Sequence, residues 1–387
     1  MKVTKRTLVL RATAGIVLVC LLYNSNWQGW EPLHCREGSS RWCSRFRSGL
    51  TIPLTPTNTS SLTLRGNSNY YMKNGAVWKG TLYCPSLVEA DPLSYLRLTD
   101  FFSEESEWRK DASNILLAET SCKNNPTYRE WCAVESLARQ NPMARVWYVM
   151  TSRVLSLRNG LAVRLVERYP NLRPVTANLQ QVFSGTPLMN LYTSREWNRN
   201  TTWPAVSLSN MARLALVWHV GGFYSDTDVV CIAPVTALRN VVGLYDDAHV
   251  NNAAFHFDRH KSFLHAAMTY ISVNFRPDIW GVNGPKALTN VLTSACGADQ
   301  VATENECMGV RILNKQAFYP LSLPMWDSVF RPLPIFNINR TFSKSYLIHM
   351  WNKYSYQQPI VKGSGSIYDV AAKTFCPVTW EAATVLY

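Results

Sequence analysis

Two aspartates, Asp226 and Asp228, stand one residue apart in the segment FYSDTDVVC. Residues 223–232 read as a β-strand, in which alternation would place both carboxylates on one face, with Cα atoms roughly 6.5 to 7 Å apart. At an effective dielectric constant near 20, like charges about 6 Å apart repel by about 2 to 3 kcal/mol, so a partly buried pair requires a cation, hydrogen-bond donors or a raised pKa. Carboxylates suit Mg²⁺, Mn²⁺ or Ca²⁺, and a two-residue set leaves coordination positions open for phosphates. The pair therefore predicts a metal site for a phosphorylated ligand, against the alternative of a solvated turn.

A helix and a glycine turn are expected to position this pair. Ser209 is a good N-cap, because its hydroxyl can accept from an amide of the first helical turn. Asn210 and Arg213, three residues apart, share one stripe of the helix and could point together into the site. Gly221 and Gly222 are expected to end the helix. The packing face of this helix is predicted to contain Met211, Leu214, Ala215 and Trp218.

The order of these residues resembles a known signature. The pattern S-D-x-x-R…G-G-x-Y-x-D-x-D of nucleotide-sugar glycosyltransferases of the GT-A fold is matched by Ser209, Arg213, Gly221, Gly222, Tyr224, Asp226 and Asp228. More narrowly, the chain is similar to the alpha-1,4-glycosyltransferase family. Further similar stretches follow in family order over residues 111–387: LLAETSC, WCAVESLARQNP, NAAFHFDRH, WGVNGP, AFYP, HMWNKYS and CPVTWEA.

The resemblance implies a retaining, metal-dependent enzyme with a GT-A-like α/β domain. It would transfer a hexose from UDP-galactose or a UDP-N-acetylhexosamine, in alpha-1,4 linkage, to the terminal sugar of a glycolipid such as lactosylceramide. Asp226 and Asp228 would hold Mn²⁺ against the diphosphate, and Arg213 would add a positive hydrogen-bond donor near the phosphates or the sugar. Front-face attack and double displacement both remain open, because the sequence identifies no nucleophile.

Two further residues come from the H-x-W-N-K segment of the resemblance. His349 would complete the metal ligand set, with a buried histidine bonded to a carbonyl as the alternative. Lys353, four residues later, would meet a diphosphate oxygen.

Tyr224 would lie on the donor side. Asn210 stands where the family pattern has Asp, so the site loses one charge; a pseudoenzyme or a metal-dependent sugar-binding membrane glycoprotein is therefore the alternative function.

Other candidate residues border the expected site. Glu119, Thr120 and Ser121 lie where a predicted strand ends, at its carboxyl end, where they would either border the uridine pocket or cap the next turn. By the resemblance, Asn252 faces the sugar. The same resemblance places the acceptor side at Trp280, Asn283 and Gly284.

An alternating pattern of strands and helices predicts the fold. Residues 115–119 and 145–150 read as strands, and residues 132–141 and 161–169 read as helices that end before prolines. Such alternation favours a mostly parallel sheet with ligands at the carboxyl ends of its strands. Glu135 and Arg139, one turn apart, are expected to form a surface ion pair.

The N-terminal region predicts a membrane attachment. Residues 1–6 would form a cytoplasmic tail, residues 7–23 a transmembrane signal anchor, and residues 24–110 a stem. Residues 111–387 would then form a lumenal catalytic domain of a single-pass type II Golgi membrane protein. Its metal-containing half would cover residues 111–245 and its acceptor-side half residues 246–387.

Charge and cysteine content are consistent with that compartment. The formal net charge of +13 suits nucleotide diphosphates or a membrane surface, whereas scattered basic residues disfavour nucleic acid. A homodimer is left open. Of the ten cysteines, Cys296 and Cys307 flank a short polar segment and are the preferred disulfide, with two buried thiols as the alternative.

Overall fold

The computed structural model describes residues 94–107, 113–199, 201–297, 301, 306–334 and 336–384. By its contacts the chain divides into two units, Met1–Arg65 and Gly66–Tyr387, and every described residue lies in the second. No helix within these ranges is both long enough and apolar enough to cross a membrane. The predicted tail and anchor, residues 1–6 and 7–23, lie outside the described residues.

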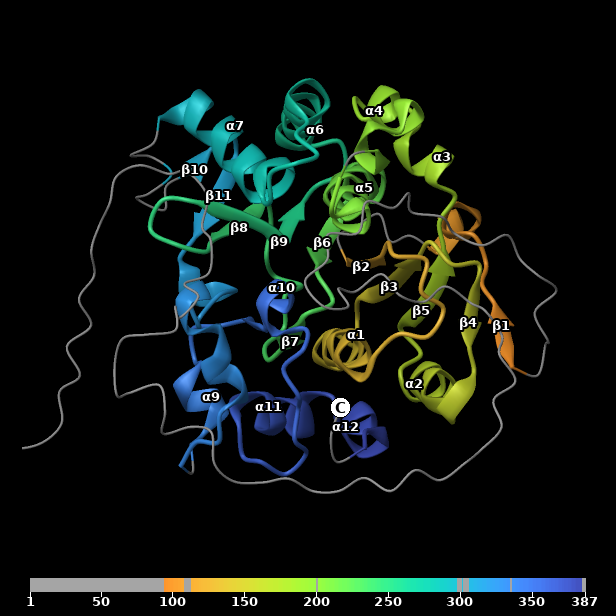
Figure 1. The fold of residues 1–387 in the computed structure, drawn as a ribbon, viewed down its shortest axis with the longest axis vertical. Coiled ribbons are helices and arrows are strands. Elements are labelled where there is room, and N and C mark those ends of the chain that lie inside the picture. The colour runs from red at the N-terminus through yellow and green to blue at the C-terminus, as the bar shows by residue number, and fades with distance from the viewer. Residues whose placement is uncertain are drawn as a thin grey trace, which may run out of the picture. The chain divides into compact units, whose positions relative to one another are not determined.

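An eight-stranded sheet forms the centre of this unit (Figure 1). Its strands run in the order β10 (Glu306–Cys307), β11 (Val310–Leu313), β8 (Val241–Leu244), β9 (Val250–Phe257), β6 (Gly222–Ser225), β2 (Asn114–Glu119), β3 (Arg145–Met150) and β5 (Leu172–Thr176). Two small sheets pair β1 (Tyr95–Arg97) with β4 (Val154–Ser156), and β7 (Val229–Cys231) with β12 (Leu347–His349).

The main sheet is mixed, which corrects the prediction of a mostly parallel sheet. Strands β6, β2, β3 and β5 pair in parallel, as do β8 and β11. Strand β9, however, is antiparallel to both of its neighbours, β8 and β6, and β10 is antiparallel to β11. The reason is the short connection between β8 and β9, because only antiparallel neighbours can be joined by a tight turn.

Helices cover both faces of the sheet (Figure 1). Alternate residues of each strand point to opposite faces. Leu116 and Trp147 belong to the core under α5, whereas Leu117 and Tyr148 belong to the core under α1. The longer helices are α1 (Tyr128–Gln140), α2 (Leu161–Arg168), α5 (Pro204–Val220), α6 (Ser262–Asn274), α7 (Ala287–Cys296) and α11 (Ile367–Phe375). Shorter helices include α3 (Leu179–Phe183), α4 (Met189–Ser194) and α12 (Pro377–Ala382).

Helix α5 begins six residues earlier than predicted. Trp203 is its N-cap and Pro204 occupies the first turn, where a missing amide hydrogen costs nothing. Ser209 therefore lies inside the helix, and its predicted capping role is wrong. The predicted end of the helix is confirmed, because Gly221 follows Val220 with φ +67°. A Cβ on the next residue, Gly222, would lie 2.3 Å from the carbonyl oxygen of Asn114. Only glycine thus allows β6 to lie beside β2 at this point.

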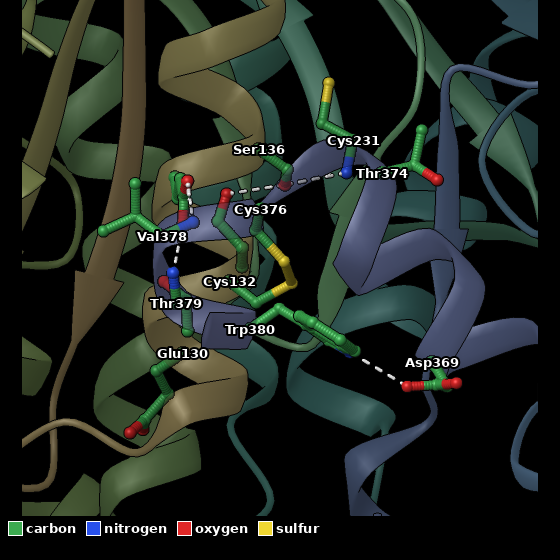
Figure 2. Close-up of a disulfide and its surroundings, with 12 residues drawn as sticks. Glu130, Cys132, Ser136, Cys231, Asp369, Thr374, Cys376, Val378, Thr379 and Trp380 are labelled. Carbon is green, nitrogen blue, oxygen red and sulfur yellow. Dashed lines mark hydrogen bonds between the residues drawn. A yellow bond between two sulfur atoms is a disulfide. The ribbon is translucent and has the colours of Figure 1, made fainter. Parts of the chain in front are cut away.

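Two disulfides within the described residues fix helices to their neighbours. The predicted Cys296–Cys307 bridge is confirmed. A second bridge, Cys132–Cys376, joins α1 to the segment before α12 across 244 residues (Figure 2). Cys231 is a buried free thiol whose sulfur points away from this bridge (Figure 2).

Glu135 lies on the buried side of α1, so its predicted surface pair with Arg139 is wrong. Its side chain is inaccessible to solvent. Its carboxylate accepts hydrogen bonds from the Tyr169 hydroxyl at 2.8 Å and from the backbone amides of Val378 and Thr379 at 3.0 and 2.7 Å. Glu135 therefore anchors the first turn of α12 to α1, a contact between residues 243 positions apart that helical spacing cannot indicate.

The folded unit also includes residues before position 111. Strand β1 pairs with β4, and Phe101 is fully buried with its ring 5.4 Å from that of Trp147. Residues 94–107, which the sequence assigned to the stem, thus contribute to the core of the domain.

Candidate active site

Asp226 and Asp228 lie in the turn between β6 and β7 rather than along one strand. The predicted continuous strand over residues 223–232 is wrong, because β6 ends at Ser225 and β7 begins at Val229. The Asp226 amide donates to the carbonyl oxygen of Ala253 at 2.8 Å, which holds the turn against β9. The two carboxylates still converge, but through the turn rather than through strand alternation.

Strand β12 brings His349 to this turn. In the antiparallel pairing of β12 with β7, His349 is opposite Val229, and the amide of Met350 donates to the carbonyl oxygen of Asp228 at 2.8 Å. The Nε2 atom of His349 lies 3.4 Å from Oδ1 of Asp228. One side-chain ligand atom from each of Asp226, Asp228 and His349 lies within 4.8 Å of the other two. The predicted metal ligands are therefore neighbours in space.

Arg213 of α5 holds the Asp226 carboxylate. Its two terminal nitrogens lie 3.0 and 3.1 Å from the two carboxylate oxygens, and the Tyr224 hydroxyl donates to Oδ1 at 2.9 Å. Arg213 also donates to the carbonyl oxygen of Asn252 at 2.8 Å. Burial raises the pKa of Asp226, the Arg213 charge opposes this rise, and the charge of Asp228 adds to it. A quarter of the Asp226 side chain remains exposed, so a cation can reach it.

The donor chemistry fits a divalent cation, with one rearrangement at His349. Two carboxylates and an imidazole form a ligand set that such ions accept. In the structure, Nδ1 of His349 accepts a hydrogen bond from the Trp351 amide at 3.0 Å, so the proton of the neutral ring lies on Nε2, facing Asp228. Coordination through Nε2 therefore requires the proton to move to Nδ1 and the Trp351 amide to turn away.

Asn352 fixes the second aspartate. Its backbone amide donates to Oδ2 of Asp228 at 2.7 Å, at the start of α10 (Asn352–Ser355). Trp351 precedes it with φ +53°, an uncommon conformation for a bulky residue. The Trp351 ring lies 4.6 Å from that of His349, and its indole N–H donates to the carbonyl oxygen of Leu321 at 2.9 Å. Sequence reasoning missed both roles, although both residues lie inside the HMWNK segment.

Asn210 and Asn252 form a buried amide pair near Arg213. Nδ2 of Asn252 donates to Oδ1 of Asn210 at 2.9 Å. A Cβ on Gly284 would lie 2.8 Å from both of these atoms, so the pair needs a residue without a side chain there. The structure thus brings Asn210, Asn252 and Gly284 together. Asn283 exchanges hydrogen bonds with the backbone of Arg276 at 2.9 and 2.6 Å.

Lys353 lies over an aromatic ring rather than beside the aspartates. Its Nζ atom is 3.9 Å from the centre of the Trp280 ring and 5.6 Å from that of Trp203. Burial lowers the pKa of Lys353 to about 8, with no contribution from a charged neighbour. Its contact with a donor diphosphate stays a prediction.

The residues at the end of β2 cap a turn, which was one of the two predicted roles. The Glu119 carboxylate accepts from the hydroxyl and amide of Ser121 and from the amide of Lys123. Burial raises the pKa of Glu119 to about 7. The Thr120 hydroxyl donates to the carbonyl oxygen of Ala205 at 2.9 Å, which ties β2 to the first turn of α5.

Comparison with known proteins finds two adjoining family matches. Residues 127–247 match the glycosyltransferase sugar-binding region containing the DXD motif, and residues 256–383 match the alpha 1,4-glycosyltransferase conserved region. Human lactosylceramide 4-alpha-galactosyltransferase is 30% identical over 314 residues, which cover 79% of this chain and 85% of that protein. Human alpha-1,4-N-acetylglucosaminyltransferase is 26% identical over 275 residues, covering 69% and 79%.

Among solved structures, the galactosyltransferase LgtC in complex with donor and acceptor sugar analogues aligns with a TM-score of 0.38 and 14% identity, over 70% of this chain and 97% of that one. Membership rests on the sequence relatives. The two family matches include the aspartate pair and His349 in their ranges. This chain belongs to the alpha-1,4-glycosyltransferase family.

Proposed function

We propose that this chain transfers galactose or an N-acetylhexosamine from a UDP-sugar, in alpha-1,4 linkage, to the terminal sugar of a glycolipid. The observation that carries the proposal is the convergence of Asp226, Asp228 and His349 in a chain of this family. The names of the relatives support the reaction class, since they describe transfer of galactose to lactosylceramide and transfer of N-acetylglucosamine. The domain would be of the GT-A type, anchored in the Golgi membrane with its catalytic part in the lumen.

A divalent ion, for which we propose Mn²⁺, would be held by Asp226, Asp228 and His349 and would neutralise charge on the departing UDP. The chain's own contacts prepare this site. Arg213 orients the Asp226 carboxylate, and the amide of Asn352 orients that of Asp228. Because both carboxylates are held before the ligand arrives, little conformational freedom is lost when the donor binds.

The residues around the metal site would have different roles, according to whether they lie on the donor side or the acceptor side. Arg213 lies between Asp226 and the Asn252 carbonyl, so it places positive charge where the donor's phosphates or sugar would approach. Asn210 and Asn252 would face the donor sugar, and Trp280 would lie on the acceptor side.

The experiment is a measurement of UDP release by the full-length chain with a lactose-terminated glycolipid as acceptor. Three donors are compared: UDP-galactose, UDP-N-acetylgalactosamine and UDP-N-acetylglucosamine, each with Mn²⁺ or with EDTA. We expect Mn²⁺-dependent release that the acceptor stimulates with one of these donors. UDP binding without turnover of any donor would favour the pseudoenzyme alternative, and Asn210→Asp would then be the variant to restore activity.

The variant Asp228→Asn tests the metal site. Its remaining oxygen can still accept from the Asn352 amide, so we expect normal folding with a loss of turnover of at least about 100-fold. The matched control is Asp247→Asn, because the Asp247 side chain is 91% exposed and its ion pair is with Lys315, away from the site residues. Full activity of Asp228→Asn would remove the aspartate pair from the mechanism.

A further inference from the structure

Three tripeptides of the chain have the form Asn-x-Ser/Thr without a proline in the middle, and they begin at Asn58, Asn200 and Asn339. This pattern is the acceptor sequence for N-linked glycosylation of secreted and lumenal proteins. The pattern by itself is weak evidence, because a glycan is bulky and the asparagine that carries it must lie at the protein surface. Asn58 and Asn200 lie outside the described residues, whereas the surroundings of Asn339 are described.

Asn339 lies in α9 (Ile338–Thr341), a single helical turn whose two sides differ in burial. Ile338 and Phe342, four residues apart, are only 6% and 7% exposed and belong to the apolar cluster that also contains residues of α11. Residues four apart share one side of a helix, so this side fixes the turn to the core. The three residues of the acceptor sequence, 339–341, lie between these two anchors and are all exposed.

The two side chains that glycosylation requires are not used by the described part of the fold. Within the described ranges, neither the amide of Asn339 nor the hydroxyl of Thr341 has a hydrogen-bond partner. The cap of the turn is a different asparagine, Asn337, whose side chain accepts from the Arg340 amide at 3.0 Å. A glycan on Asn339 therefore displaces no contact that holds α9 in place.

The position of α9 is compatible with a modified but active enzyme. The turn lies beside α11 (Figure 1), and none of the residues that we place at the metal site belongs to it. A glycan that points from α9 into solvent leaves Asp226, Asp228 and His349 in their arrangement.

The disulfides support the compartment that this modification needs. Cys132 is bridged to Cys376, and Cys296 is bridged to Cys307. Such bridges persist in the lumen of the endoplasmic reticulum and in secreted proteins, and they are rare in the cytosol. The machinery for N-linked glycosylation acts in the same lumen.

We propose that Asn339 carries an N-linked glycan, transferred from a lipid-diphosphate-linked oligosaccharide. In this transfer Nδ2 of Asn339 forms a bond to C1 of the first sugar, the amide loses one proton, and the lipid diphosphate leaves. Thr341 provides the hydroxyl that the acceptor sequence requires at its third position. This inference rests on the lumenal placement of the domain in the proposed function.

The test is expression of the full-length chain in animal cells, followed by digestion with an N-glycosidase that converts each glycosylated asparagine to aspartate. We expect mass spectrometry to find this conversion at position 339. Without digestion, Asn339→Gln should migrate faster than the unmodified chain in gel electrophoresis, by the step that one glycan produces.

Variants of the neighbouring residues separate the acceptor sequence from the asparagine alone. Thr341→Val keeps the shape of the side chain without its hydroxyl, so it should lose the same glycan as Asn339→Gln. Thr341→Ser restores a hydroxyl and should keep the glycan. Arg340→Lys is the matched control, because the middle position accepts any residue except proline, and its glycan should also remain.

Unfolding by guanidinium chloride shows whether the variants are folded. Since the Asn339 side chain makes no contact within the described part of the chain, Asn339→Gln should unfold at the same denaturant concentration as the unmodified chain after enzymatic deglycosylation.

The outcomes distinguish this inference from the placement on which it rests. Glycans at Asn58 or Asn200 together with an unmodified Asn339 would overturn the inference and leave the lumenal placement standing. A chain that carries no N-linked glycan, in spite of its three acceptor sequences, would overturn both. The transferase reaction is tested separately by UDP release, which does not depend on either result.

Discussion

Replacing Arg213 with methionine is expected to lower the free energy of unfolding by about 3 kcal/mol. The Arg213 side chain is only 5% exposed, and its two terminal nitrogens meet both oxygens of Asp226 at 3.0 and 3.1 Å. At an effective dielectric constant of 20, opposite charges 3 Å apart attract by about 5 kcal/mol, which the desolvation of both groups partly offsets. Breaking such a pair usually costs about 3 to 5 kcal/mol, because the remaining charge is left uncompensated. Since a quarter of the Asp226 side chain is exposed, water can compensate part of its charge, which favours the lower end of this range.

A double-mutant cycle with Asp226→Asn isolates the pair. The assay is guanidinium chloride unfolding of the full-length chain, followed by tryptophan fluorescence. The double variant no longer contains the unpaired charge, so we expect it to be more stable than Arg213→Met alone, with a coupling energy of about 2 kcal/mol. Arg276→Met is the control, because both side chains of the Arg276–Asp278 pair are exposed and the loss of the pair should have no measurable effect. A loss below about 1 kcal/mol for Arg213→Met, or a double variant no more stable than the single one, would refute this reasoning.

Three further measurements test other parts of the structure. Glu135→Gln places an amide donor against backbone amides that now donate to the carboxylate, so we expect a loss of about 2 kcal/mol in unfolding free energy, whereas a surface residue would lose almost nothing. Replacing Cys132 and Cys376 with alanine opens a bridge across 244 residues and should cost about 3 to 5 kcal/mol by the same assay; an unchanged midpoint would contradict this. Because burial lowers the pKa of Lys353 to about 8, its charge is present below that pH and lost above it. UDP affinity should therefore fall between about pH 7 and 9, Lys353→Arg should abolish this fall, and a flat profile in the unmodified chain would count against the role of the ammonium.

The local elements were largely predictable from the sequence. The strands at residues 115–119 and 145–150 are present as β2 and β3, and the helix around residues 132–141 is present as α1. These segments are defined by runs of apolar residues and by prolines and glycines, which act over a few positions. Where the start of an element depends on a cap, the prediction was less accurate: α1 begins at Tyr128, with Thr127 and Glu130 forming its capping box.

Contacts between distant segments were not predictable in the same way. The sequence of α1 is the same whether Glu135 faces water or the C-terminal helices. Only the packing of α12 against α1 shows that Glu135 is buried. The mixed character of the sheet has a similar cause. Strand β9 is buried along its whole length, so its burial does not indicate its direction, which follows from the short connection to β8 and from its place between β8 and β6.

The residue types and spacing of Asp226, Asp228, His349 and Arg213 determined the chemistry of the site, since two close carboxylates require a positive partner wherever they are buried. The tertiary structure decided how that requirement is met. It placed a turn where a strand was predicted, paired β7 with β12 so that His349 reaches Asp228, and buried Arg213 beside Asp226. It also laid Lys353 across Trp280, a contact between segments 73 residues apart. Charge balance is a property of residue types and can be read along the chain, whereas which groups balance each other depends on distances that exist only after folding.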